Sequence, residues 1–69
     1  MATNTHYASA IPARLRAARG NVPRKKICAE VGISVSALAM YETGKRIPKD
    51  EIKVALAKTY NTSVDALFF

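Results

Sequence analysis

The sequence predicts an all-α fold. Apolar residues recur at helical spacings of three and four, and no segment alternates apolar and polar residues as a half-buried strand would. Glycine, proline and serine stand at intervals that suit the ends of short helices. A chain of 69 residues forms one small domain with a thin core, because only about 60% of its surface can be buried. We expect that domain over residues 8–69, after a polar and aperiodic flexible arm over residues 1–7.

The first predicted helix starts at Ser9, whose side chain can cap it. Pro12 is tolerated there because it falls within the first turn. Gly20 and Asn21 end the helix, since both accept the left-handed backbone of a C-terminal cap. The apolar stripe of this helix is formed by Ile11, Leu15 and Ala18.

Two further helices follow closely. Pro23 favours the start of the first of them, and Gly32 ends it. Ser34 can cap the next, so a three-residue turn containing a glycine separates the two. Short helices joined in this way cross steeply, which predicts a helix-turn-helix over residues 23–42. The side chains expected to point inward are Ile27, Val31, Leu38 and Tyr41.

The C-terminal third predicts two more helices. Asp50 and Glu51 suit the positive end of the helix dipole at the start of a fourth helix. Asn61 closes that helix, and Ser63 can cap a last short one. The buried stripes expected on these helices consist of Ile52, Leu56 and Tyr60, and of Val64, Leu67 and Phe68.

The net charge of +6 is unevenly distributed. One basic cluster lies within residues 14–26, which contain no acid, and a second follows Gly44. Clusters of this kind suggest a polyanionic partner, most often phosphate, although a solvated cationic face explains the charge equally well. The basic residues of the two clusters are Arg14, Arg16, Arg19, Arg24, Lys25, Lys26, Lys45, Arg46 and Lys49.

The composition argues against catalysis and against a metal site. One histidine, one cysteine and five acids, scattered along the chain, assemble no nucleophilic, paired-carboxylate or metal-ligating pattern. His6 lies in the expected arm, and Cys28 is expected to fill a small slot against the core. No secretory or membrane-spanning segment is visible. We therefore expect a cytoplasmic protein without enzymatic activity, cofactor or membrane partner.

The stretch LRAARGNVPRKKICAEVGISVSALAMYETGKRIP resembles the Cro/lambda-repressor-like, XRE-type helix-turn-helix regulators of bacteria and phages. The matching elements are RLR (14–16), VGIS (31–34), YETGKRIP (41–48) and SVDALFF (63–69), in the order and spacing of the family. The resemblance implies a five-helix lambda-repressor-like domain. Its second helix would brace on the DNA backbone, and its third would be the recognition helix. Two features depart from the family: a longer RGNV turn, and Pro23 where a Ser or Thr cap is usual.

The resemblance assigns the recognition surface to the side of the third helix that lies opposite Leu38 and Tyr41. Apolar side chains on that surface can pack on thymine methyls, while Ser36 can bond any base edge, so we expect weak direct readout and reliance on DNA shape. Packing against a neighbouring element is the plain alternative for such a face. The expected base-facing residues are Val35, Ser36, Ala37 and Met40, and the expected phosphate-facing residues are Arg24, Lys25, Ser34, Lys45 and Arg46.

Two further expectations concern contacts within and between chains. The family commonly pairs the glutamate at the position of Glu42 with an arginine of the first helix, and Arg16 fits that place. A solvated Glu42 is the alternative. The C-terminus carries two aromatic residues that so small a monomer could hardly cover both of, which suggests a dimer interface at Leu67, Phe68 and Phe69.

The leading functional hypothesis is a sequence-specific transcriptional regulator, expected to be a repressor, that places helix 34–42 in the major groove of double-stranded DNA. Two copies would form a homodimer on half-sites about 34 Å apart. The alternative is a protein-interaction module of the same fold, anti-repressor or antitoxin-like, with weak or no DNA binding. The scarcity of polar side chains on the recognition helix motivates this alternative.

Overall fold

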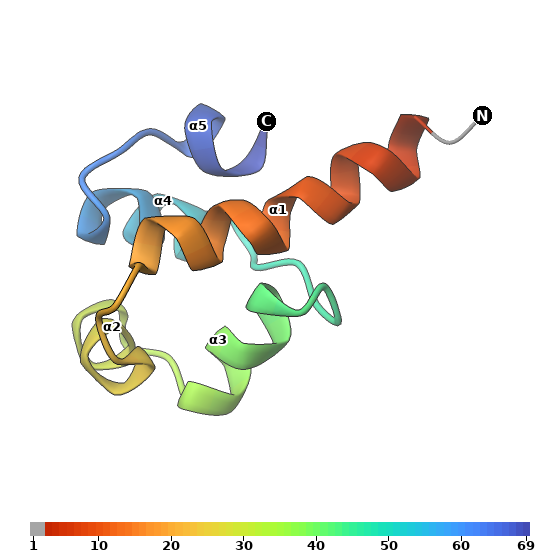
Figure 1. The fold of residues 1–69 in the computed structure, drawn as a ribbon. Helices are drawn as coiled ribbons and strands as arrows, with labels where there is room; N and C mark the ends of the chain where they lie inside the picture. Colours follow the sequence, from red (N-terminus) through yellow and green to blue (C-terminus); the bar gives the residue numbers. More distant parts are fainter. Residues whose placement is uncertain (1–2) are drawn as a thin grey trace.

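The structure, a computed structural model, describes the backbone of residues 3–69 and the side chains of residues 10–69. Over these residues it is all-helical and contains no strand, which confirms the predicted fold class. α1 packs on α3 and α5, while α2 lies against α3 and α4, so that the first helix lies between α3 and the C-terminal α5 (Figure 1). No helix of the described part is long and apolar enough to cross a membrane. The helices are α1 (Thr3–Arg19), α2 (Arg24–Val31), α3 (Val35–Glu42), α4 (Asp50–Thr59) and α5 (Val64–Phe68).

α1 is longer than the sequence predicts. Its helical backbone begins at Thr3, so it replaces most of the flexible arm expected over residues 1–7. No glycine or proline before Pro12 stops a helix here, and Pro12 itself stands inside the helix, where it removes one intrahelical hydrogen bond. The side chains of Ser9, the predicted cap, and of His6 lie outside the described residues.

The turn between α2 and α3 is capped by hydrogen bonds at both of its ends. Gly32 ends α2 with a left-handed backbone (φ 85°), a conformation that glycine adopts without a steric penalty. The amides of Gly32 and Ile33 both donate to the Cys28 carbonyl, over 2.8 and 3.2 Å. On the other side, the Ala37 amide donates to Ser34 Oγ over 3.0 Å. The predicted helix-turn-helix is therefore held by local caps at its turn.

The core gathers side chains from all five helices. Two of the three predicted stripe residues of α1 are buried, but Ala18 is exposed. Cys28 lies in the core, as expected, with 4% of its surface exposed. Val31, Ile52, Tyr60 and Val64 are half-buried and pack against this core. The buried apolar residues are Ile11, Leu15, Ile27, Cys28, Leu38, Tyr41, Leu56, Ala57, Leu67 and Phe68.

The structure corrects the predicted dimer interface at the C-terminus. Leu67 and Phe68 are 3% and 1% exposed, because α5 turns both side chains inward between α1 and α4. Phe69 keeps 64% of its surface exposed. Lys53 Nζ lies 5.5 Å from the ring centroid of Phe68 and 5.9 Å from that of Phe69. One monomer thus covers the first aromatic ring, so Leu67 and Phe68 are core residues rather than interface residues.

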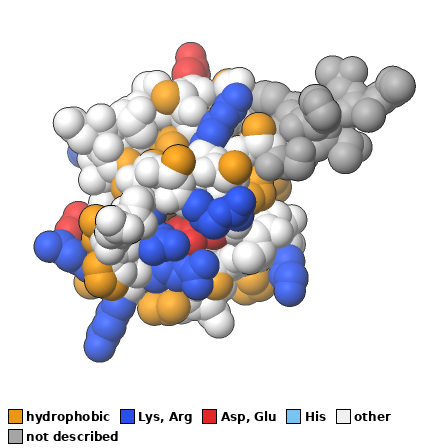
Figure 2. Space-filling model, viewed as in Figure 1, with side chains coloured by type: hydrophobic (Ala, Val, Ile, Leu, Met, Phe, Trp, Pro, Cys, Tyr) orange, Lys and Arg blue, Asp and Glu red, His pale blue; other side chains and the backbone are white. Residues whose placement is uncertain are grey.

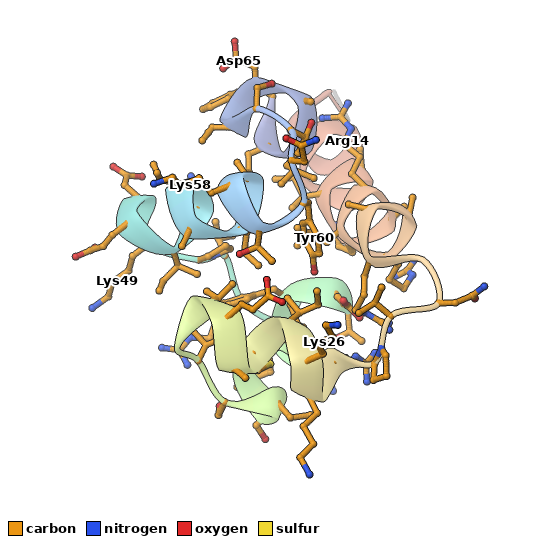
Figure 3. All side chains as sticks on the ribbon, turned by 90° about the vertical axis from the view of Figure 1, so that its left-hand side faces the viewer. Arg14, Lys26, Lys49, Lys58, Tyr60 and Asp65 are labelled. Carbon is orange, nitrogen blue, oxygen red and sulfur yellow. The ribbon has the colours of Figure 1, made fainter. Side chains whose placement is uncertain are left out.

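The hydroxyl of Tyr60 is buried and has no hydrogen-bond partner among the described residues. Burial, and after it the negative charge of Glu42, raise the pKa of Tyr60 to about 12, although the charge of Arg19 opposes this shift. Figure 3 shows Tyr60 pointing from the end of α4 toward the interior between the helices. Tyr60 is therefore expected to stay neutral in the folded chain at every physiological pH.

Tyr60→Phe tests this account. Removing an unpaired buried hydroxyl is expected to leave the free energy of unfolding at pH 7 unchanged, or to raise it by about 1 kcal/mol. Because the folded pKa of about 12 exceeds the unfolded value near 10, wild type should lose at most roughly 2 kcal/mol relative to the variant as pH rises from 10 to 12. Urea unfolding at both pH values measures the difference. A variant less stable than wild type at pH 7 would mean that the hydroxyl has a partner.

Candidate nucleic-acid interface

α3 has one side in the core and one side facing away from the molecule. On the outer side Ser36 is exposed, Met40 is half-buried, and Val35 at the edge keeps 46% of its surface exposed. Ala37 is half-buried and packs against the core, so it contributes less to the outer surface than the sequence suggests. The inner side consists of Leu38, Tyr41 and Glu42.

Two residues on the outer side of α3 were missed by sequence reasoning. Ala39 and Thr43 lie three and seven positions after Ser36, which places both on the same helical face. Thr43 is exposed and its hydroxyl donates to the Ala39 carbonyl over 2.8 Å, while Ala39 is half-buried. Helical spacing counted from Ser36 was the signal that would have found them.

Cationic side chains and one hydroxyl group lie before and after the outer face of α3 in the sequence. Lys25 in the first turn of α2 and Ser34 at the start of α3 are exposed, and so are Lys45 and Arg46 in the loop after α3. The Lys45 amide donates to the Met40 carbonyl over 2.9 Å, which ties the start of that loop to α3. Figure 2 shows lysine and arginine side chains gathered in the middle of one side of the molecule, around an acidic side chain.

A buried carboxylate joins the first three helices. Glu42, at the end of α3, is 0% exposed. Arg19 of α1 binds it with two nitrogens, Nε to Oε2 over 2.7 Å and Nη2 to Oε1 over 2.9 Å. Arg24 of α2 donates from Nε to Oε1, also over 2.9 Å. We call these three residues the Glu42 cluster; it is where α1, α2 and α3 meet.

The cluster corrects the predicted salt bridge between Arg16 and Glu42. Arg16 Nη1 donates to the main-chain carbonyl of Glu42, not to its carboxylate. Arg19 lies almost one turn further along α1 and reaches the carboxylate, which leaves Arg16 to satisfy a carbonyl at the end of α3 that has no intrahelical partner. Arg19 Nη1 also donates to the Val22 carbonyl over 2.9 Å, so the same side chain holds the turn before α2.

Arg24, which is expected to contact phosphate, is only partly available for such a contact. Its Nε is bound to Glu42, yet its side chain is 36% exposed, against 17% for Arg19. The helix it begins has no side-chain cap, since Pro23 occupies the N-cap position and makes no such bond. Part of the Arg24 side chain therefore faces outward while Glu42 fixes its Nε.

The charge of Glu42 is stabilised in the folded chain. Burial on its own would raise the pKa of this carboxyl, but the hydrogen bonds and charges of Arg19 and Arg24 outweigh it, and the pKa lies below its ordinary value. The hydrogen bond to Glu42 raises the pKa of Arg19 in turn. The cluster is therefore ionised at neutral pH, and its contribution to folding is lost only in acid.

Cys28 shows no sign of reactivity. Burial, and then the charge of Glu42, raise the pKa of its thiol, which donates to the Ser34 carbonyl over 3.4 Å. A raised pKa disfavours the thiolate, which is the nucleophilic form. Within the described part of the chain no group of His, Cys, Asp and Glu is placed to hold a metal ion.

Comparison with known proteins gives one match. A family model described as helix-turn-helix matches residues 13–67, from the middle of α1 to α5. Searches of curated proteins and of solved structures found no match.

Arg19→Ala tests the Glu42 cluster. We expect a loss of about 3 kcal/mol in the free energy of unfolding at pH 7, because a buried carboxylate would lose two of its hydrogen bonds. The difference from wild type should shrink as pH falls below about 4, since the depressed pKa of Glu42 stabilises wild type only while the carboxyl is ionised. Arg24→Ala is the matched control and should cost less. Urea unfolding across pH 2–7 measures these differences, and equal losses for the two variants would contradict the ranking.

Proposed function

Because this chain belongs to the Cro/C1-type, XRE-like helix-turn-helix family of DNA-binding regulators, we propose that it is a sequence-specific transcriptional repressor that inserts α3 into the major groove. The observation that carries the proposal is the outer face of α3. That face is exposed around Ser36 and Val35, and exposed cations precede and follow α3 in the chain. A face that only packed within the monomer would be buried.

The flanking residues would hold the DNA backbone. Lys45 and Arg46 in the loop after α3, and Lys25 with Ser34 before it, are exposed and carry donors suited to phosphate oxygens. Arg24 would contribute the exposed part of its guanidinium group while Glu42 holds its Nε. Such contacts position the protein on the duplex without reading its sequence.

Base readout by this face would depend little on paired hydrogen bonds. α3 contains no arginine, asparagine or glutamine, the side chains that bond guanine or adenine edges in pairs. Val35, Ala39 and Met40 are suited to thymine methyls, and the hydroxyls of Ser36 and Thr43 to any base edge. We infer that specificity comes from methyl contacts and from the shape of the DNA.

One such domain covers few base pairs, so we propose that two copies bind a two-fold symmetric site. Half-sites would then lie about 34 Å apart, one turn of the double helix. The lack of arginine, asparagine and glutamine on α3 supports this, because a second copy adds affinity that one domain with few base-specific hydrogen bonds lacks.

Binding to a random duplex of about ten base pairs, long enough for one copy, tests the DNA-binding proposal. Wild type should bind at about 50 mM salt, and log affinity should fall with log salt by about 0.9 per phosphate contacted. Lys45→Ala and Arg46→Ala should each lower that slope by about 1, on all sequences alike. Lys58→Ala is the charge-matched control, because Lys58 lies on the exposed side of α4, which faces away from α2 and α3 (Figure 3). Absence of binding at about 50 mM salt would favour the protein-interaction alternative.

Replacing thymine by uracil in a site selected from random DNA tests the readout proposal. Loss of the methyls that contact Val35 or Met40 should weaken binding by about fivefold or more at particular positions, and Met40→Ala should remove the sensitivity at the positions that Met40 contacts. Competition assays with matched duplexes measure both effects. Affinity unchanged by uracil at every position would rule out methyl contacts.

A further inference from the structure

The outer side of α4 has no partner within the described chain. Leu56 and Ala57 face the core, whereas Glu51, Val54 and Lys58 are exposed. Val54 keeps 53% of its surface exposed, a large fraction for an aliphatic residue in the middle of a helix. Figure 3 shows α4 along one outer side of the molecule, with Lys58 on the exposed part of the helix.

The order of side chains along this outer side is acid, apolar, base. Glu51 and Lys58 are seven positions apart, so they lie almost in line along the helix, separated by about 10 Å. Val54 lies between them, next to the half-buried Ala55. In the described part of the chain neither Glu51 nor Lys58 takes part in an ion pair; the pair on α4 joins Lys53 to Asp50 over 3.8 Å.

We propose that this side of α4 is the surface on which a second copy of the chain docks. Two α4 helices packed antiparallel across a two-fold axis near Val54 and Ala55 place Glu51 of each copy beside Lys58 of the other. The two Val54 side chains then meet at the centre and lose their exposure to water. The small Ala55 lets the helices approach to the 8–10 Å typical of helix packing.

The order of charges along the outer side of α4 favours a second copy of this chain over a different partner. An isologous interface brings one patch against the same patch reversed, and a stripe that reads acid, apolar, base is complementary to its own reverse. Antiparallel helices also set opposite ends of their dipoles side by side. A membrane surface or an acidic protein would match Lys58 but would repel Glu51.

The contact is small, which limits its strength. A ten-residue helix is about 15 Å long, so the buried area falls below the roughly 1,200 Å² of standard stable interfaces. The free protein should therefore associate weakly and pair fully only when two copies are held on neighbouring half-sites. The inference rests on the proposed two-copy binding mode, but the association itself requires no DNA.

Sedimentation equilibrium of the free chain, up to about 1 mM protein at about 50 mM salt, tests the proposal. Wild type should show a reversible monomer–dimer equilibrium. Glu51→Lys and Lys58→Glu should each weaken it by about tenfold, because each places like charges in contact twice per dimer. The double variant Glu51→Lys/Lys58→Glu should restore it to within about threefold of wild type.

Asp65→Lys is the control for Glu51→Lys, since it makes the same change in net charge at an exposed residue of α5. It should leave the equilibrium unchanged apart from general repulsion. Amide chemical shifts that move with protein concentration should cluster on α4. A chain that stays monomeric, a double variant that does not recover, or shifts centred on Phe69 would each overturn the proposal. Binding to a one-copy duplex is independent of this interface, so failure here leaves the DNA-binding proposal separately testable.

Discussion

The carboxylate of Glu42 is the constraint on which the arrangement of the first three helices depends. Among residues 10–69 it is the one charged side chain fully removed from solvent. A buried carboxylate without partners would cost several kcal/mol, so α1 and α2 must bring Arg19 and Arg24 to within hydrogen-bond distance of it. Arg16 adds a bond to the main chain at the same place. Because Glu42 ends α3, these bonds set where the outer face of α3 points.

Local chemistry explains why much of the fold is predictable from the sequence. The caps at Ser34 and Ser63, and the left-handed residues Gly32 and Asn61, act within a few residues of where they stand, and each is found as expected. The helix-turn-helix follows from such local signals together with the apolar spacing. The start of α1 at Thr3 was missed because no comparable capping signal marks it. The prediction placed the start of the helix at Ser9 instead, because a serine side chain can cap a helix.

Contacts between distant segments were less predictable. Arg16, Arg19 and Arg24 all donate hydrogen bonds to Glu42. Only the three-dimensional path of α1 decides that Arg19 binds its carboxylate while Arg16 binds its main-chain carbonyl. The C-terminal aromatics pose the same problem, since two neighbouring phenylalanines have opposite burial once α5 packs between α1 and α4. On α3 the exposed side was found correctly around Ser36, but Ala37 lies nearer the core than helical spacing alone suggested.

The loop after α3 passes close to α1 at Gly44. Gly44 has a backbone φ of 78°, and a side chain there would begin 3.3 Å from Cγ of Pro12. A side chain at position 44 is therefore disfavoured on two grounds, by a left-handed dihedral angle that glycine adopts most readily and by a tight contact with a proline more than thirty residues earlier in the chain. A larger residue at this bend would need the side chain at position 12 to give way, so the two positions are expected to vary together. The bend that leads to the cations of the loop is thus packed against the first helix, so a change in either segment is expected to affect where those cations lie.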